Sequence, residues 1–531
     1  MKYNKAYLPL IISIGLAVGI LIGFYMPHPS AGLYSGFPPS NDKLDRILNK
    51  IESDYVDSIN RDDLIESVIP MVLQKLDPHS VYIPAKDLAK ANEPLQGNFE
   101  GIGVSFNMIT DTVLIMSTIS GGPSEKLGIQ AGDKIIFIND SLVAGKKIPD
   151  QDIIKMLKGP RGSKVTIKIL RKGAANLLPF TITRDKIPLY SIDVAYMMSK
   201  ETGYIKISNF AVTTFEEFSN SLRQLKKDGM TKLILDLRGN SGGVMEAATM
   251  IADEFLQDGK LIVFTKGKSR PREDIKATSD GDFEKGDLVV LIDEWSASAS
   301  EILAGAIQDN DRGTIIGRRS FGKGLVQEPV MFRDGSGMRL TIARYYTPTG
   351  RSIQKPYSGD FEKYYEDLDN RFLHGEFEQA DSIHFKDTLK YVTPGGKVVY
   401  GGGGIMPDVF VPMDTTGVSK YFVAIRNAGL IYRFSIKYTE DNRDRLKKFT
   451  DSKSLDNYLL KQDLMNKFVS YAAANGVKPD SEGIRISHDI LYVQLRAYIA
   501  RNMLDNAGFY PIWQNIDRTL LEAEKYIESQ K

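Results

Sequence analysis

Ser298 lies where a serine could act as a nucleophile. A short apolar run at 289–292 is typical of a strand buried on both faces, and a small-residue turn at 296–300 follows it. Apolar residues then recur at helical spacing from 299 to 307. We therefore expect Ser298 at the start of a helix, where unpaired backbone N–H groups can bind a developing negative charge. The alternative is an inert helix cap, because Glu301 completes a capping box with Ser298.

A nucleophilic serine needs a base, and Lys323 is the candidate. It lies between two glycines in Ser-Phe-Gly-Lys-Gly, where the backbone can turn sharply and the amine can approach another group. Residues 325–330 resemble a strand, and if it extends back to Lys323, an offset of four puts Gln327 on the same face. Gln327 could then orient the amine. A lysine base must be neutral, which requires a pKa about three units below its usual value of about 10.4. The alternative is a solvated loop lysine.

Other nucleophiles and bases have weaker support. The chain has no cysteine, which removes thiol nucleophiles and cysteine-based metal sites. The histidines lie beside the N-terminal apolar segment, in a helical lead-in, or in polar or helical contexts without a triad motif: His28, His79, His374, His384 and His488. A second enzyme hypothesis is a Ser–His hydrolase that uses His374 or His384. It predicts that replacing that histidine abolishes activity, whereas Lys323→Ala leaves activity intact.

The motifs around Ser298 and Lys323 resemble those of the carboxy-terminal processing, or tail-specific, protease family. The matching runs are Ser-Ala-Ser-Ala-Ser-Glu-Ile at 296–302 and Phe-Gly-Lys-Gly-x-x-Gln at 321–327. The resemblance implies that Ser298 is the nucleophile, Lys323 the general base and Gln327 the residue that orients the lysine.

A glycine-rich turn at 236–243 follows a predicted buried strand and precedes a predicted helix. It contains neither a P-loop lysine nor the G-x-G-x-x-G pattern, so nucleotide binding has little support. The turn resembles the family segment that supplies one oxyanion donor, and the amide after the nucleophile supplies the other. This implies Gly242 or Gly243 as one donor and Ala299 as the second. Ser241 replaces the family's usual proline, which leaves the choice of glycine open.

Length and composition indicate a globular protein of several domains. The chain has 531 residues, 42% of them apolar and 25% charged, enough for about three or four domains. A net charge of +1 gives no support for nucleic-acid binding. We expect no metal and no organic cofactor at a Ser/Lys site.

The N-terminal segment 1–26 is expected to be a membrane anchor. Lys2 and Lys5 precede an apolar run at 6–26, and about twenty such residues can span a bilayer. No clean Ala-x-Ala cleavage site follows, which favours an uncleaved anchor over a removed signal. The lysines would stay cytoplasmic, so we expect a bacterial envelope protein with its protease on the periplasmic side. A linker rich in Pro, Gly and Ser follows at 27–40.

Residues 41–95 carry two amphipathic patterns and are expected to be helical. The Leu-Asp-Pro-His-Ser sequence at 76–80 ends the second pattern and resembles a family signature. In the family this region often mediates dimerisation, so a homodimer is a hypothesis.

Residues 96–186 change to short strands with turn residues between them and one helix at 151–157. This pattern resembles a PDZ domain. It implies a loop whose successive N–H groups bind a chain-terminal carboxylate, formed by Gly101, Ile102, Gly103 and Val104. The expected partners are proteins or peptides with free, apolar C-termini.

The remaining chain is predicted to form the protease core at 187–412, with insertions, and a helical region at 413–531 in which we find no chemistry. The predicted fold is therefore multidomain α+β: a membrane anchor, a helical segment, a PDZ domain, an α/β core with a mixed sheet, and C-terminal helices.

The predicted function is a serine endopeptidase that captures C-terminal tails and cuts peptide bonds with a Ser/Lys dyad. An adaptor protein is a further hypothetical partner. The rival hypothesis is a catalytically silent PDZ scaffold, or a ligand-binding relative that keeps the core fold.

Overall fold

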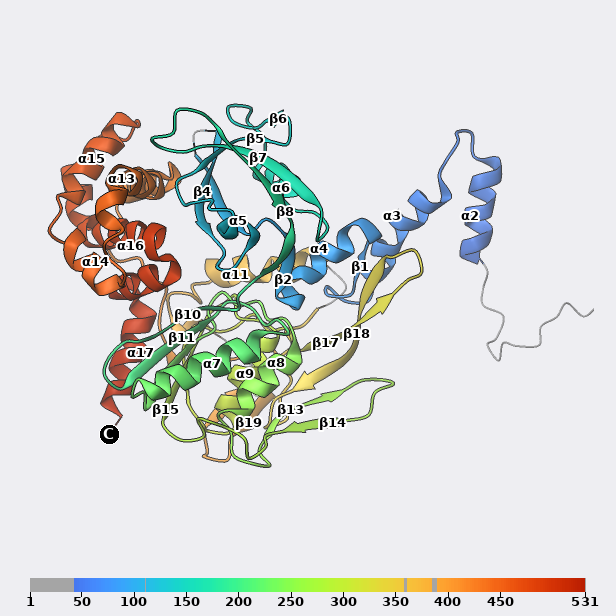
Figure 1. The fold of residues 1–531 in the computed structure, drawn as a ribbon. Coiled ribbons are helices and arrows are strands. Elements are labelled where there is room, and N and C mark those ends of the chain that lie inside the picture. Colours follow the sequence, from blue (N-terminus) through green and yellow to red (C-terminus); the bar gives the residue numbers. More distant parts are fainter. Residues whose placement is uncertain (1–42, 110, 358–360, 384–388, 531) are drawn as a thin grey trace, which may run out of the picture. The chain divides into compact units, whose positions relative to one another are not determined.

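The computed structural model describes residues 43–109, 111–357, 361–383 and 389–530 (Figure 1). The predicted anchor at 1–26 and linker at 27–40 lie outside these residues. Within the described ranges no helix is long and apolar enough to cross a bilayer. The chain divides into two compact units, Met1–Ile69 and Pro70–Lys531.

The first unit contains α2 (Lys43–Asp54) and most of α3 (Arg61–Leu73), as the amphipathic patterns predict. Leu48 is the buried residue of α2, whereas Leu44 and Ile47 on the same helix stay exposed. Among the described residues, part of the apolar face of α2 is therefore exposed.

Two short elements begin the second unit, β1 (Val81–Ile83) and α4 (Ala85–Gln96). Most of α4 falls within the region 41–95 that was expected to be helical, although this helix has no buried residue and contains Pro94. It ends at Gly97, whose φ of 66° is a left-handed conformation that suits glycine.

The segment predicted to be a PDZ domain forms an antiparallel sheet in the order β3-β4-β5-β7-β8. The strands are β3 (Val104–Ile109), β4 (Thr112–Thr118), β5 (Lys134–Ile138), β7 (Lys164–Leu170) and β8 (Leu178–Thr183), with β6 (Ser141–Leu142) beside β5. Two helices, α5 (Pro123–Lys126) and α6 (Asp150–Leu157), complete it. Alternate residues of β7 are buried in its core: Val165, Ile167 and Ile169. A two-stranded ribbon of β2 (Asn98–Gly101) and β9 (Asp185–Pro188) lies outside this sheet.

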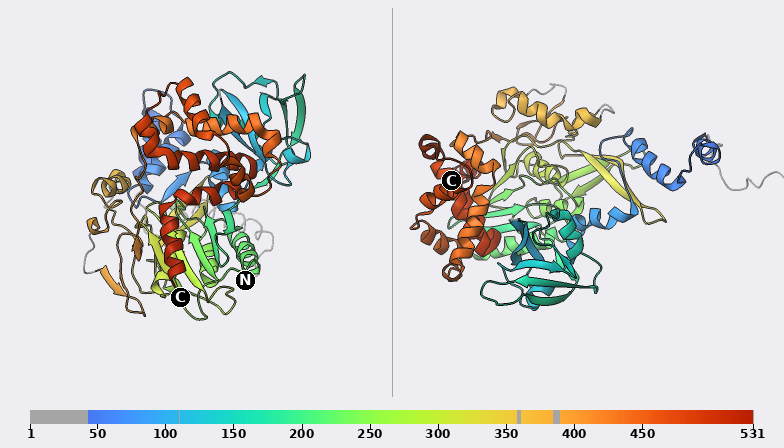
Figure 2. Two further views of the ribbon diagram at one scale, coloured as in Figure 1. Left: turned by 90° about the vertical axis from the view of Figure 1, so that its left-hand side faces the viewer. Right: turned by 90° about the horizontal axis from the view of Figure 1, so that it is seen from above.

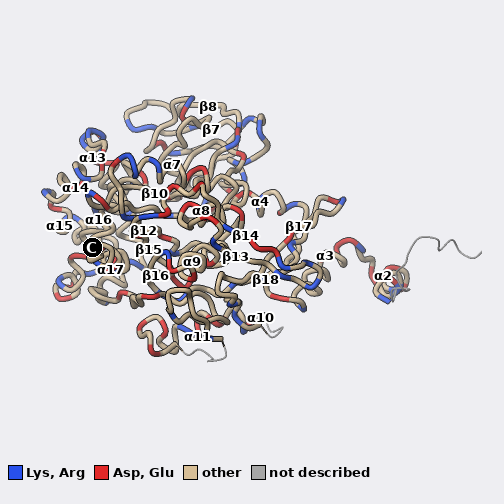
Figure 3. Tube along the Cα trace, turned by 90° about the horizontal axis from the view of Figure 1, so that it is seen from below, with Lys and Arg blue, Asp and Glu red and all other residues tan. Residues whose placement is uncertain are grey.

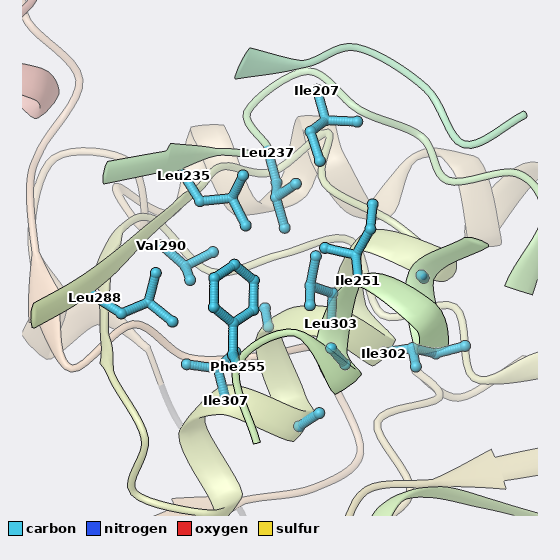
Figure 4. Packing of buried hydrophobic residues seen from close by; sticks show 14 of the residues in the cluster. Ile207, Leu235, Leu237, Ile251, Phe255, Leu288, Val290, Ile302, Leu303 and Ile307 are labelled. Atoms are coloured by element: carbon cyan, nitrogen blue, oxygen red, sulfur yellow. The ribbon is translucent and has the colours of Figure 1, made fainter. Parts of the chain in front are cut away.

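The core is built on a mixed six-stranded sheet in the order β10-β11-β12-β15-β16-β21, parallel except for β10. The strands are β10 (Ile192–Met197), β11 (Thr202–Ile207), β12 (Lys232–Asp236), β15 (Asp287–Ile292), β16 (Thr314–Gly317) and β21 (Val409–Phe410). One face packs against the helices α7 (Thr214–Lys227), α8 (Met245–Asp253) and α9 (Ala299–Asp309). Figure 4 shows Leu235, Val290 and Leu303 meeting Phe255 in this layer.

The opposite face of the same sheet is covered by α17 (Arg518–Ser529). Its buried residues Leu520, Ala523 and Ile527 pack on strand residues that include Leu291 and Ile316. The left view of Figure 2 shows α17 lying over these strands. The last helix of the predicted C-terminal region therefore completes the core sandwich.

A second sheet carries the segment after Lys323. Its strands are β13 (Leu261–Lys266), β14 (Glu273–Lys276), β17 (Leu325–Met331) and β18 (Gly337–Tyr346), with β1 on β18. The insertion that follows contains α10 (Phe361–Tyr365), α11 (Asp367–Leu373), η2 (Ala380–Ser382), β19 (Lys390–Val392) and β20 (Val398–Tyr400).

The C-terminal region is helical, as predicted, with a large apolar core of its own. Its elements before α17 are α12 (Lys420–Asn427), α13 (Leu430–Leu446), α14 (Ser452–Leu459), α15 (Leu464–Ala474), α16 (Ser481–Trp513) and η4 (Gln514–Ile516). Basic and acidic residues are interspersed along the traced chain (Figure 3). The multidomain α+β prediction is confirmed for the helical regions, the antiparallel-sheet domain within 96–186 and the core with its mixed sheet.

Candidate active site

Ser298 is the N-cap residue of α9, and its backbone is strained. Its φ of 55° and ψ of −112° lie in a region that a residue with a side chain rarely adopts. The residue is partly exposed, whereas every residue of α9 behind it is buried. Such strain persists only where the surroundings fix it, and it is common at functional sites.

The buried carboxylate of Glu301 fixes both Ser298 and Lys323. Its Oε2 accepts hydrogen bonds from the backbone N–H groups of Ser298 and Lys323, each at 2.9 Å. Its Oε1 accepts from Ser320 Oγ at 2.5 Å and from Gly322 N at 2.7 Å. Because two backbone nitrogens bind one oxygen atom, Ser298 and Lys323 are neighbours in space.

Burial raises the pKa of Glu301 to about 7, against the four hydrogen bonds, which favour the ionised form.

The hydroxyl of Tyr345 also links Ser298 to Lys323. It lies 3.1 Å from the carbonyl oxygen of Ser298 and also contacts that of Lys323. The sequence showed Glu301 only as a capping residue, since the partners at 320–323 lie in a separate loop.

The Lys323 amine donates to Gln327 Oε1 at 3.2 Å. Burial lowers the pKa of Lys323 below 10.5, although the nearby Glu301 carboxylate acts in the opposite direction. A lowered pKa is the direction that a lysine base needs.

The premise from which we predicted this contact is wrong. The strand does not extend back to Lys323, because β17 begins at Leu325 and a bulge interrupts its pairing between Val326 and Gln327. A bulge changes which face the next side chain occupies. The contact therefore forms from a loop residue and a bulged strand.

Gln327 is in turn held by the turn at 77–80, which the sequence analysis treated as the end of a helix. Its Nε2 donates to the backbone oxygen of His79. Asp77 Oδ1 shapes the turn by accepting from the N–H groups of His79 at 2.8 Å and Ser80 at 2.9 Å. No local pattern could reveal this contact, because its partners are 248 residues apart.

The His79 ring lies near this site but contacts another group. Its Nε2 is 2.8 Å from the Tyr364 hydroxyl. Burial, with a smaller effect from Lys323, lowers the His79 pKa to about 4, so the ring is neutral at neutral pH. Of the histidines in the Ser–His hypothesis, His374 is exposed with Nδ1 2.6 Å from Asn370 O of its own helix, and His384 lies outside the described residues.

The glycine-rich turn lies directly against Ser298. A Cβ atom on Gly242 would lie 2.8 Å from Ser298 Cβ and 2.9 Å from Ala299 N. The Gly242 N–H already donates to Asn240 Oδ1 at 2.9 Å. Across the described residues, the amides of Gly243 and Ala299 have no hydrogen-bond partner. Of the two glycines, Gly243 therefore keeps a free amide.

The predicted carboxylate-binding loop borders a groove of about 320 Å³ between β3 and α6. Ile102, Gly103 and Val104 line this groove, and Ile154 and Leu157 supply apolar surface from α6. Gly101 is not among the lining residues, because it ends β2 and pairs with Asp185 of β9. Three of the four predicted residues thus meet at one groove.

Both segments that carry these candidate sites match known protein families. Residues 201–362 match peptidase family S41, and residues 101–180 match the PDZ domain. A carboxy-terminal-processing protease of Bartonella bacilliformis is 35% identical over 316 residues, which are 58% of this chain and 71% of that relative. This chain belongs to peptidase family S41. The resemblance drawn from the motifs is confirmed.

Other known proteins match this S41 chain over different lengths and at different identities. The carboxy-terminal processing protease CtpA of Bacillus subtilis is 35% identical over 315 residues, 59% of this chain. The chain spans 66% of that relative, just under two thirds. A solved structure of a photosystem II D1 C-terminal processing protease is 24% identical, covering 70% of this chain and 94% of the other at a TM-score of 0.36. Residues 421–505 match a family of unknown function.

Proposed function

We propose that this S41 chain is a serine endopeptidase of the carboxy-terminal processing type with a Ser298/Lys323 dyad. The observation that carries the proposal is the strained Ser298 whose backbone shares one Glu301 oxygen with Lys323. Membership of the family and the lowered Lys323 pKa support it.

In the proposed reaction the neutral Lys323 amine accepts the proton of Ser298 Oγ, which attacks the carbonyl carbon of the scissile bond. The carbonyl oxygen becomes an oxyanion that accepts hydrogen bonds from the amides of Ala299 and Gly243. Lys323 then gives its proton to the leaving amine, and the acyl-enzyme forms. A water molecule deprotonated by Lys323 hydrolyses the acyl-enzyme, and Gln327 holds the amine throughout.

The proposed substrates are proteins or peptides with free, apolar C-termini, bound as an added strand beside β3. The apolar lining of the groove from Ile102, Val104, Ile154 and Leu157 supports this choice. Backbone N–H groups of the loop at 102–104 would bind the terminal carboxylate.

The proposed location is a bacterial cell envelope, with residues 6–26 in the cytoplasmic membrane and the catalytic core on the periplasmic side. The apolar run and its preceding lysines support it. A homodimer through the N-terminal helices and an adaptor protein remain hypotheses; the exposed Leu44 and Ile47 of α2 favour the first.

The test is cleavage of an unfolded reporter by the chain from Asp42 onward. The reporter carries an apolar tail with either a free or an amidated C-terminus, and Ser298→Ala is the blank. We expect rapid Ser298-dependent cleavage of the free-tail reporter and much slower cleavage of the amidated one. If the folded wild type binds the free tail but never cuts it, the scaffold hypothesis replaces this proposal.

Ile154→Asp should weaken tail capture without damaging the dyad. A charge in the apolar groove must be desolvated when a tail binds, so we expect the Kd for a fluorescent tail peptide to rise at least about 10-fold. Leu142→Asp on the exposed β6 is the matched control and should leave the Kd unchanged. Equal Kd values for the two variants would contradict the assignment of the groove.

A further inference from the structure

A partly buried cluster of charged side chains links the glycine-rich turn beside Ser298 to the C-terminal region. Arg238, in this turn, donates from Nε and Nη2 to the two Asp236 oxygens at 3.0 and 2.6 Å. Its Nη1 and Nη2 donate to the two Asp517 oxygens, each at 2.8 Å. Arg238 therefore bridges two carboxylates with paired hydrogen bonds to each, a geometry that fixes the guanidinium plane.

The charges of this cluster balance. Lys206 Nζ lies 3.6 Å from Asp236 Oδ2, so two cations face two carboxylates. Asp236 is 1% exposed and Arg238 and Asp517 are each 16% exposed. Arg238 and Lys206 hold the Asp236 pKa below its usual range in spite of burial. Loss of Asp517 would leave two cations, Lys206 and Arg238, facing the single carboxylate of Asp236.

Hydrogen bonds of the glycine-rich turn connect Arg238 to the residues on either side of Ser298. Lys206 Nζ donates to the Arg238 carbonyl oxygen at 2.9 Å. Two residues later, the Asn240 carbonyl oxygen accepts from Ala297 N at 3.0 Å and Ser300 Oγ at 2.9 Å, on either side of Ser298. The Asn240 side chain binds Gly242 N. A displacement of Arg238 would therefore move the glycine-rich turn relative to Ser298.

Asp517 lies far outside the matched S41 segment at 201–362. It caps α17 by accepting from Leu520 N at 3.1 Å, and α17 covers the core sheet. We infer that Asp517 is a positioning residue for the glycine-rich turn at 236–243, so that the C-terminal region completes the active site. The inference rests on the proposed function.

The experiment compares Asp517→Asn with Asp193→Asn in the same chain that cleaves the reporter. Asp193 Oδ2 accepts from Tyr510 OH at 3.0 Å, so it too joins the core to the C-terminal region, but through a hydrogen bond in which the glycine-rich turn takes no part. For Asp517→Asn we expect kcat to fall about 10- to 100-fold with KM within about 2-fold, because misplaced groups slow the chemical step. Labelling of Ser298 by a fluorophosphonate should slow in parallel, and tail-peptide affinity should not change.

Asp517→Glu keeps the charge and should recover part of kcat, which a purely structural role of the side chain would not predict. If Asp517→Asn does not fold, Arg238→Lys, which loses the paired geometry, should show the same selective fall in kcat. The inference is overturned if the folded variant at Asp517 or Arg238 loses no more kcat than Asp193→Asn. Wild type without Ser298-dependent cleavage would overturn the proposed function, and this inference with it.

Discussion

Replacing Lys323 with methionine is expected to lower kcat for the free-tail reporter by at least about 1000-fold, because Ser298 loses the base of the proposed dyad. Methionine keeps an unbranched, partly buried side chain, so folding should be little affected. Lys266→Met on the exposed end of β13 is the control and should cleave like wild type. The Ser298→Ala, Lys323→Met double variant should be no slower than either single variant, since the two residues act as a unit.

The pH dependence should identify the same group. Below its pKa the Lys323 amine is protonated and cannot accept the serine proton, so kcat/KM should rise with pH. Because burial lowers the Lys323 pKa, the midpoint of this rise should lie below 10.5. The residual activity of Lys323→Met should lack this rise. A variant that keeps near-wild-type activity and the same pH profile would exclude Lys323 as the base.

Glu301→Leu is expected to reduce the free energy of unfolding by at least about 4 kcal/mol, because it leaves two buried and two partly buried donors without an acceptor. The loop around Lys323 would also lose its link to Ser298, so cleavage should be abolished even in the folded fraction. Urea unfolding measures the first effect and the reporter assay the second.

Two further variants make this result specific. Glu301→Gln keeps the shape and one acceptor oxygen and should lose less stability than Glu301→Leu. Glu246→Leu on the exposed start of α8 should change stability by no more than about 0.5 kcal/mol. Glu301→Leu within about 1 kcal/mol of wild type would refute the carboxylate as the link between the two halves of the site.

The sequence was sufficient to predict the parts of the site that local motifs encode. Ser298 at a strand-to-helix turn follows from an apolar run and a helical period. The Lys323–Gln327 contact was predicted too, but from a continuous strand that the structure does not have, since β17 begins at Leu325. The alternating strands and helices of the core follow from the same periodicities. The bulge in β17 did not, because a single extra residue leaves no mark on an apolar pattern.

Contacts between segments that are far apart in the chain could not be predicted from the sequence. The turn at 77–80 binds Gln327, and Asp517 binds Arg238 across 279 residues. An aspartate at the start of a helix looks like any other cap. Only the folded chain reveals which of these caps carries a second charge partner.

The cover that α17 provides has a consequence for biosynthesis. The chain emerges from the ribosome in order, so the strands from β11 to β16 are all complete about 200 residues before Leu520, Ala523 and Ile527 are made. During that interval Leu291 and Ile316 have no helix to cover them, and Arg238 has no second carboxylate. In a nascent S41 chain of this type, one face of the core sheet would thus stay exposed until α17 has been translated. The glycine-rich turn beside Ser298 would lack its contact with Asp517 for the same time.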